Sequence, residues 1–340
     1  MVDNLKMGSR KDFYWFPYTS EIKKITRKGR YKITYKGGEE IIELSRTHSL
    51  LFYGTSNAIN MDFAEDCVKF GVPIVFHRRN IVKPIIISGG FRNDRDDTIT
   101  FQLSARNNER KKRHISRKLL EAKFKSQRWL VDTPPILNKD QSIDEMRIVE
   151  AHHANLYWRR FYRSLDMAHE TRRGKNELST VLDAYSKFLA GVVLRWVTFH
   201  HLSPHHGFLH VQTDYPSLVY DLMEPYRGIY DRLVFENWRY LKGKDEQMRM
   251  GHAFGILKDH LRDDVYVGLT RQISARQELY HGSVISLKHY LLKKQRTFAI
   301  PLPSKPNGGR PTKVSFIMYG RKAGRTDFWK VANGLQDKSV

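Results

Sequence analysis

A change of periodicity near residue 106 constrains the fold of this chain more than any other feature. Before it, residues 31–36 alternate in polarity, Gly37 and Gly38 supply a turn, and residues 40–44 return, which is typical of a β-hairpin. Further strands are expected at 50–53, 72–76 and 84–88. A short amphipathic helix is expected at 57–70, with Ile59, Phe63 and Cys67 four residues apart and a stop at Gly71. The first part of the chain is therefore predicted to be β-rich.

The second part predicts helices. Residues 106–128 hold ten Lys and Arg against two Glu, and Ile115, Leu119 and Ala122 keep helical spacing. Such a helix packs one face and leaves the others basic, which fits either a DNA-backbone contact or an ordinary solvated helix. We predict an α+β fold. Its parts are an N-terminal β domain over 1–92, a linker over 93–108, an all-α catalytic domain over 109–300, and a basic tail over 301–340. The tail is either a flexible DNA-binding arm or a disordered end.

Charge indicates the class of partner. The 340 residues include 59 Lys and Arg against 36 Asp and Glu, a net charge of +23. An excess of this size, clustered along the chain, favours a polyanion such as nucleic acid, although some basic proteins are merely soluble. No apolar run reaches the length of a membrane span, and no apolar signal core follows the N-terminus, so we expect a cytoplasmic protein without membrane contact. The single cysteine, Cys67, excludes an internal disulfide.

A glutamate lies on the apolar face of the helix predicted around residues 146–165. Met146, Ala154, Tyr157 and Phe161 share that face with Glu150. A carboxylate among apolar side chains is costly unless it is paired or bound to a metal, so Glu150 either forms a buried pair with an arginine or ligates a cation.

A second group of candidate ligands follows later in the chain. His210 stands among apolar residues, where a histidine is more often structural than ligating, and Asp221 and Glu224 are one helical turn apart. Pro225 disfavours helix at Glu224, so we expect a break there, with Glu224 near the start of the next helix. Carboxylates with an imidazole suit Mg²⁺ or Mn²⁺, and such an ion could activate a hydroxyl for attack on a phosphodiester.

Other motifs exclude other chemistries. No glycine-rich phosphate loop or nucleophile elbow is present, so ATP hydrolysis and serine hydrolysis are not expected. Pro204 interrupts the histidine cluster at residues 200–206, which makes a zinc site improbable. His152 and His153, beside Glu150, either tune its surroundings or are exposed.

Three stretches of the chain resemble the CRISPR-associated adaptation integrase family. They are residues 50–79, LLFYGTSNAINMDFAEDCVKFGVPIVFHRR; residues 150–162, EAHHANLYWRRFY; and residues 207–233, GFLHVQTDYPSLVYDLMEPYRGIYDRL. The third is the most specific, because it contains the family's histidine and its Asp-Leu-x-Glu-Pro-Phe/Tyr-Arg segment. Together they indicate a resemblance over most of residues 20–300.

The resemblance implies a mechanism and a set of roles. The reaction would insert short DNA, the spacers of antiviral defence, into a repeat array by attack of a 3′-hydroxyl, with endonuclease activity on branched DNA. The roles carried over are these: Glu150, His210 and Glu224 as metal ligands, Asp221 as an acidic catalytic neighbour that either assists or shares the metal, Arg227 on the DNA backbone, and Tyr220 near the reacting strand. Family members dimerise through the β domain and work as two dimers bridged by a small ferredoxin-like partner protein.

The chain also departs from the family pattern. Ala151-His152-His153-Ala154 stands where the family often has Gly-x-Ala-Ala, the tail beyond Pro301 has no counterpart, and the net charge is higher than expected. These departures leave open a variant that acts without the small partner. Further alternatives are a casposon-type transposase with the same active site, a nuclease that cuts branched DNA without joining it, and a non-catalytic DNA-binding scaffold.

Overall fold

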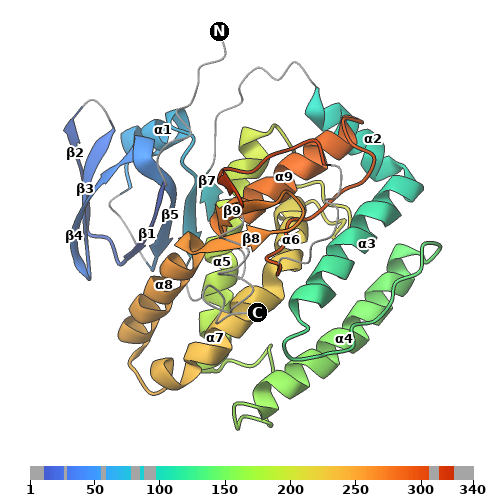
Figure 1. Ribbon diagram of the computed structural model, residues 1–340. Helices are drawn as coiled ribbons and strands as arrows, with labels where there is room; N and C mark the ends of the chain where they lie inside the picture. Colours follow the sequence, from blue (N-terminus) through green and yellow to red (C-terminus); the bar gives the residue numbers. More distant parts are fainter. Residues whose placement is uncertain are drawn as a thin grey trace. The chain divides into compact units, whose positions relative to one another are not determined.

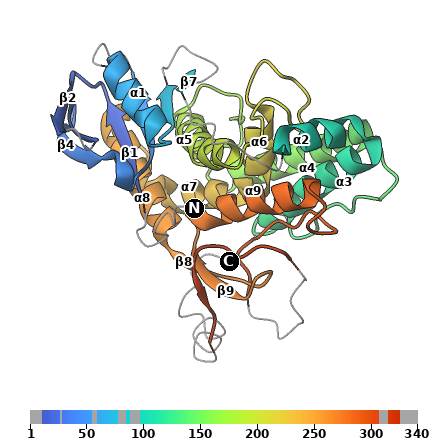
Figure 2. The same cartoon turned by 90° about the horizontal axis from the view of Figure 1, so that it is seen from above.

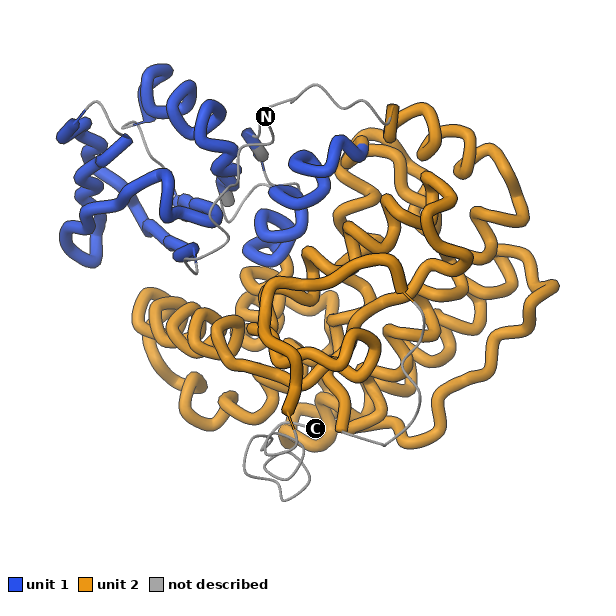
Figure 3. Tube along the Cα trace, turned by 45° about the horizontal axis from the view of Figure 1, so that its top comes forward, with its two compact units in different colours: residues 1–95, 187–202 blue, residues 96–186, 203–340 orange. Residues whose placement is uncertain are grey.

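The structure, a computed structural model, describes residues 11–26, 29–54, 59–77, 85–87, 97–305 and 314–324. The chain divides into two compact units (Figure 3). Unit 1 comprises residues 1–95 and 187–202, and unit 2 comprises residues 96–186 and 203–340. Within the described ranges, no helix combines the length and apolar character needed to cross a membrane.

In its described residues, unit 1 contains two small sheets, one short helix and the end of a longer helix. The first sheet has the order β1-β5-β6-β7, parallel except for the last pair, and the second is the antiparallel meander β2-β3-β4 (Figure 1). The elements are β1 (Asp12–Pro17), β2 (Glu21–Thr26), β3 (Arg30–Tyr35), β4 (Gly38–Glu43), η1 (Leu44–Arg46), β5 (Thr47–Tyr53), α1 (Met61–Lys69), β6 (Ile74–His77) and β7 (Ile85–Ile87). The predicted hairpin corresponds to β3 and β4, and the predicted helix to α1.

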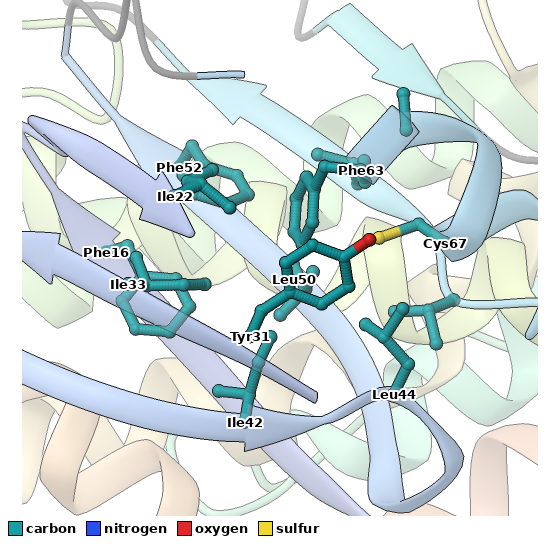
Figure 4. Close-up of a cluster of buried hydrophobic side chains, with 13 residues drawn as sticks. Phe16, Ile22, Tyr31, Ile33, Ile42, Leu44, Leu50, Phe52, Phe63 and Cys67 are labelled. Carbon is teal, nitrogen blue, oxygen red and sulfur yellow. The ribbon is translucent and has the colours of Figure 1, made fainter. Parts of the chain in front are cut away.

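The core of unit 1 forms between α1 and the strands (Figure 4). Helix α1 begins at its N-cap Asn60, whose side chain accepts the Phe63 amide, and it buries Phe63 and Cys67 at the predicted four-residue spacing. The ring of Phe63 meets that of Tyr31 edge-on at 4.8 Å, and the Tyr31 hydroxyl donates to Asp66 at 2.5 Å. The amphipathic spacing read from the sequence thus defines the buried face.

The last part of helix α5 (Glu177–Phe199) also belongs to unit 1. The buried guanidinium of Arg195 donates to the carbonyls of Thr47, at 3.1 Å, and His48, at 2.5 Å, in β5. Gly191 permits a close approach to β6, because a Cβ there would lie 2.7 Å from Cγ2 of Val75. The charged residue in this apolar helix therefore ties the helix to the sheet.

Unit 2 is mainly helical. Its helices are α2 (Thr98–Asn107), α3 (Glu109–Ser126), α4 (Ile143–Arg163), the first part of α5, α6 (Ser217–Met223), η2 (Glu224–Tyr226), α7 (Arg227–Leu241), α8 (Glu246–Arg262) and α9 (Gln277–Leu291). Helix α3 packs against α2, α4 and α7 (Figures 1 and 2). The predicted α+β class, strands first and mostly helices after, is confirmed.

A small sheet within unit 2 was not predicted. Strands β8 (Asp264–Val267), β9 (Gln272–Ala275) and β10 (Arg321–Lys322) form an antiparallel sheet in the order β10-β9-β8. The prediction of an all-α region was therefore wrong on this point. Strand β10 lies in the predicted tail, and Phe316 and Met318 before it are buried, so residues 314–324 pack as part of unit 2 and are not a free arm.

The predicted linker also contains structure. Residues 93–96 lie outside the described residues, whereas most of the remainder forms helix α2. Gln102 and Ala105 of this helix are buried. The tail residues 306–313 and 325–340 also lie outside the described residues.

Candidate active site

Helix α4 presents Glu150 from a partly buried face. A capping box starts the helix, in which the Ser142 hydroxyl accepts the Glu145 amide and the Glu145 carboxylate accepts the Ser142 amide. Met146, Tyr157 and Phe161 are buried as the apolar stripe predicted. The Glu150 side chain on that stripe is 19% exposed, so it reaches the edge of the packed face.

Asp221 organises the loop that carries His210. Its side chain is fully buried in α6, and its two oxygens accept four hydrogen bonds. Oδ2 accepts the amides of Phe208 at 2.5 Å and Leu209 at 3.0 Å, and Oδ1 accepts the His210 amide at 3.0 Å and the imidazole Nδ1 at 2.7 Å. Through these bonds Asp221 fixes the backbone of residues 208–210 and orients the His210 ring.

The bond from Nδ1 to Asp221 fixes the histidine ring. A proton on Nδ1 leaves Nε2 as the nitrogen that can ligate a metal, which is the usual arrangement of a carboxylate behind a ligating histidine. Burial opposes the charged imidazolium, but the hydrogen bond to Asp221 and the charges of Asp221, Glu224 and Glu150 outweigh burial and raise the pKa of His210. Asp221 contributes most to this rise, and Glu224 and Glu150 add to it.

Helix α2 holds the same loop from outside. Gln102 donates to the carbonyls of Ser203 at 3.0 Å and His206 at 2.8 Å, and Arg106 donates to the Gly207 carbonyl at 3.1 Å. Gly207 itself has no room for a side chain, because a Cβ would lie 2.5 Å from the His210 carbonyl oxygen and 2.7 Å from Asp221 Oδ2. The sequence analysis did not single out Gln102 or Arg106, because their partners lie in a segment far along the chain.

Glu224 lies at the predicted helix break. Helix α6 ends at Met223, η2 contains Pro225, and α7 begins at Arg227, so the proline separates two helices as expected. Glu224 is buried, and its carboxylate accepts Nη2 of Arg227 at 2.7 Å and Nε at 3.2 Å. The guanidinium predicted to contact DNA backbone therefore pairs with a glutamate of the site.

Lys123 joins the two glutamates, and the sequence analysis missed its role. Its ammonium contacts Oε2 of Glu224 at 2.6 Å and also pairs with Oε1 of Glu150, and its side chain is 7% exposed. In the sequence Lys123 is one of the many basic residues of its helix. Only its position on the same helix face as Leu119 and Leu120 could have marked it as buried.

A glycine contact brings Lys123 to this position. Gly228, in the first turn of α7, touches the end of α3 so closely that a Cβ would lie 2.3 Å from the Ser126 carbonyl oxygen. The Gly228 amide donates to the Ser126 hydroxyl at 3.2 Å, and Trp129 Nε1 donates to the Gly228 carbonyl at 3.0 Å. These contacts hold α3 against the segment that carries Glu224.

The charges of the site stabilise one another. Burial acts to raise the pKa of Glu224, but Arg227 and Lys123 lower it well below the ordinary value. Burial acts to lower the pKa of Lys123, but Glu224 and Glu150 raise it. Glu224 is therefore ionised, and its carboxylate and that of Glu150 converge on one cationic nitrogen. Carboxylate oxygens are also the ligands that a divalent cation prefers.

In this arrangement the carboxylates of Glu150 and Glu224 are both paired with Lys123. Across the described part of the chain, no three His, Cys, Asp or Glu side chains are grouped closely enough to hold a metal ion as they stand. Glu150, His210 and Glu224 fit a metal in the type of their donors, and Lys123 lies between the two carboxylates.

The remaining predicted residues lie around this group. Tyr220 is half-buried in α6, and its ring lies 5.7 Å from that of Tyr215. His153 is buried against Phe124, with ring centroids 4.7 Å apart, whereas His152 is exposed. In the histidine cluster, His206 Nδ1 lies 2.6 Å from the Ser203 hydroxyl.

Solved structures share this fold. A casposase bound to integration product matches with a TM-score of 0.73 and 18% identity, over 85% of this chain and 93% of that one. A Cas1 protein from Thermotoga maritima matches with a TM-score of 0.68 and 16% identity, over 85% and 99%. A chain of a Cas6-RT-Cas1–Cas2 complex matches with a TM-score of 0.68 and 12% identity, over 86% of this chain and 36% of that one. The fold is thus of the class that Cas1 proteins and a casposase have in common.

Within this fold class, the sequence points to one family. Residues 134–270 match the family model described as CRISPR associated protein Cas1, and that region contains Glu150, His210, Asp221 and Glu224. The resemblance to the CRISPR-associated adaptation integrase family, indicated by the sequence motifs, is confirmed. A search of curated proteins finds no match to this chain.

Proposed function

We propose that this chain is a metal-dependent DNA integrase that joins a 3′-hydroxyl DNA end to a phosphodiester of a target duplex, inserting short DNA into a CRISPR repeat array. One observation carries the proposal: two carboxylates from the region that matches Cas1, those of Glu150 and Glu224, converge on one point. His210 is electrostatically coupled to both and is oriented by Asp221.

Three side chains would hold the metal. The carboxylates of Glu150 and Glu224 and Nε2 of His210 form a mixed oxygen and nitrogen set that suits Mg²⁺ or Mn²⁺. When bound, such an ion supplies charge stabilisation to the attacked phosphodiester and activates the attacking hydroxyl. Asp221 keeps the Nδ1 proton of His210 in place, and Arg227 keeps Glu224 ionised.

The reaction itself is a transesterification. The donor 3′-oxygen forms a bond to the target phosphorus and loses its proton, while the bond from that phosphorus to the target 3′-oxygen breaks and that oxygen gains a proton. One phosphodiester replaces another, so no nucleotide cofactor is consumed. Positioning supplies much of the rate, and the basic residues along α3 and the net charge of +23 favour binding of both DNAs.

We also propose partners. The fold match to a casposase bound to integration product supports double-stranded and branched DNA as the substrate. The fold match to a chain of a Cas6-RT-Cas1–Cas2 complex supports a small ferredoxin-like partner protein. In this proposal the protein is a cytoplasmic homodimer formed through its N-terminal β domain, and two dimers work together.

A second candidate is a casposon-type transposase. It is favoured by the casposase match, which has the highest TM-score of the structures described above. The two functions differ in their DNA: a CRISPR integrase prefers a repeat array as target, whereas a transposase requires the terminal sequences of its element on the donor. A competition assay that varies donor ends and target sequence independently separates them.

Strand transfer with Mn²⁺ tests the proposal. Labelled donor DNA is incubated with a plasmid that carries a repeat, using the wild type, His210→Ala and Glu224→Gln. Both variants are expected to lose joining by more than about a hundredfold, since removal of a direct ligand exceeds the roughly 10–100-fold loss typical of second-layer partners. DNA binding in a gel-shift assay stays within about twofold.

His152→Ala is the matched control, because His152 is exposed on the helix that carries Glu150. It should join DNA at the wild-type rate. Near wild-type joining by His210→Ala would show that the metal assignment is wrong, and cutting without joining by the wild type would favour a nuclease.

A further inference from the structure

Lys123 occupies the place between the two proposed metal-binding carboxylates. Its ammonium pairs with Oε1 of Glu150 and with Oε2 of Glu224, and the pairing is buried, with side-chain exposures of 7% for Lys123 and 5% for Glu224. A lysine is almost never this buried without a partner, and here both partners are the carboxylates on which the proposed function depends.

The pairing solves an electrostatic problem of the metal-free protein. Two carboxylates at close range repel each other, and burial makes the repulsion more costly. Arg227 neutralises Glu224 from one side, at 2.7 Å, whereas Lys123 pairs with Glu224 and with Glu150. Lys123 is the cation that touches both, so it holds the carboxylates together when no metal does.

The same pairing obstructs a metal ion. A divalent cation needs carboxylate oxygens at about 2.0–2.6 Å. Lys123 binds one oxygen of each carboxylate, Oε1 of Glu150 and Oε2 of Glu224. The ammonium and a divalent cation cannot occupy this position together, because they require the same oxygens and carry like charge.

We propose that the Lys123 ammonium is an internal competitor for the metal position, which must leave Glu150 and Glu224 before a divalent cation binds and which thereby sets the metal affinity of the site. The inference rests on the proposed function and deepens it. Because the ammonium and the divalent cation exclude each other, removal of the ammonium should tighten the binding of the cation. The flexible four-carbon side chain of lysine permits the movement.

Binding of Mn²⁺ alone tests the inference, without DNA. Free Mn²⁺ is measured by electron paramagnetic resonance during titration of the wild type, Lys123→Met and Lys125→Met. Lys123→Met retains the apolar part of the side chain and removes the ammonium, and it is expected to bind Mn²⁺ about tenfold more tightly than the wild type. Lys125→Met is the matched control, because Lys125 is exposed on the same helix, and its affinity should equal that of the wild type.

The rise in melting temperature on addition of Mn²⁺ is a readout that a merely structural role of Lys123 would not change. Without metal, Lys123→Met should melt below the wild type, because two buried carboxylates lose their shared counter-charge. Saturating Mn²⁺ should raise its melting temperature by more than it raises that of the wild type. An equal or smaller rise, or an Mn²⁺ affinity no tighter than wild type, overturns the inference.

A measurement on the wild type covers the case in which Lys123→Met fails to fold. Acylation by an amine reagent, quantified by mass spectrometry, should become faster at Lys123 when Mn²⁺ is added and stay constant at Lys125. An unchanged or slower rate at Lys123 overturns the inference.

The two proposals fail in different ways. If the wild type joins DNA with Mn²⁺ but Lys123→Met binds Mn²⁺ no more tightly, only the role of Lys123 is refuted. If neither protein binds Mn²⁺ and the wild type joins no DNA, the metal-dependent function itself is refuted.

Discussion

Replacement of Asp221 by Asn tests whether this residue orients His210. The substitution keeps the size of the side chain but turns one acceptor oxygen into a donating amide. In the structure each oxygen of Asp221 accepts two N–H groups. An asparagine can satisfy only one of these two pairs, so two donors lose their acceptor and face an NH₂ group.

The cost follows from the number of bonds lost. Hydrogen bonds to a charged group each contribute about 1.5–3 kcal/mol, so the loss of two costs about 3–6 kcal/mol. Asp221 is fully buried, so water cannot replace the missing acceptor. At roughly 2 °C per kcal/mol for a chain of this size, the melting temperature should fall by about 6–12 °C.

Thermal unfolding and strand transfer measure the two consequences. Below its own melting temperature, Asp221→Asn should join DNA at least about tenfold more slowly, because Nδ1 of His210 has lost the acceptor that fixes the ring. Asp132→Asn, at an exposed carboxylate, is the control and should change neither property. A melting temperature within about 1 °C of wild type, together with unchanged joining, would refute the positioning role.

Two further predictions concern the packing and charge near the site. Gly228→Ala places a methyl group 2.3 Å from the Ser126 carbonyl, a backbone atom that cannot move aside cheaply, so the free energy of unfolding should fall by about 1–3 kcal/mol in urea denaturation. Burial, opposed by Arg227 and Arg172, raises the pKa of Asp231 from 3.8 to about 7. Between these two pKa values the folded protein keeps a proton that the unfolded chain releases. Asp231 therefore lowers the free energy of unfolding by up to about 4 kcal/mol as pH rises from about 4 to about 7. In urea denaturation across this pH range, Asp231→Asn should remove that decrease.

Each of these changes has a matched control. Gly255 also lies in a helix, but a Cβ there meets nothing within 4 Å, so Gly255→Ala should stabilise the protein by up to about 1 kcal/mol. Equal effects of the two glycine substitutions would contradict the packing argument. Asp183 is a half-exposed carboxylate paired with Arg172, and Asp183→Asn should leave the slope of stability against pH intact. If Asp231→Asn also keeps the wild-type slope, Asp231 does not titrate as described.

Much of the fold could be predicted from local patterns. Alternation in residues 31–44 predicted a hairpin, and Ile59, Phe63 and Cys67 predicted the buried face of α1, because the spacing of apolar residues reports the period of the local backbone. Strand β10 could not be predicted, since two residues pair with β9 only after the intervening chain has folded. The functional importance of α2 was missed because its partners lie about a hundred residues further along the chain.

The sequence by itself determined which residues could do chemistry, namely Glu150 on an apolar stripe, His210 in an apolar segment, and Glu224 before a proline that must break a helix. These are local signals, carried by side-chain period and by the missing amide of proline. Only the tertiary structure decided what each residue touches. It placed Lys123 between the two glutamates and turned Asp221 toward His210 and its loop. The position of Lys123 depends on how closely α3 approaches η2 and α7, and packing at Gly228 sets that distance.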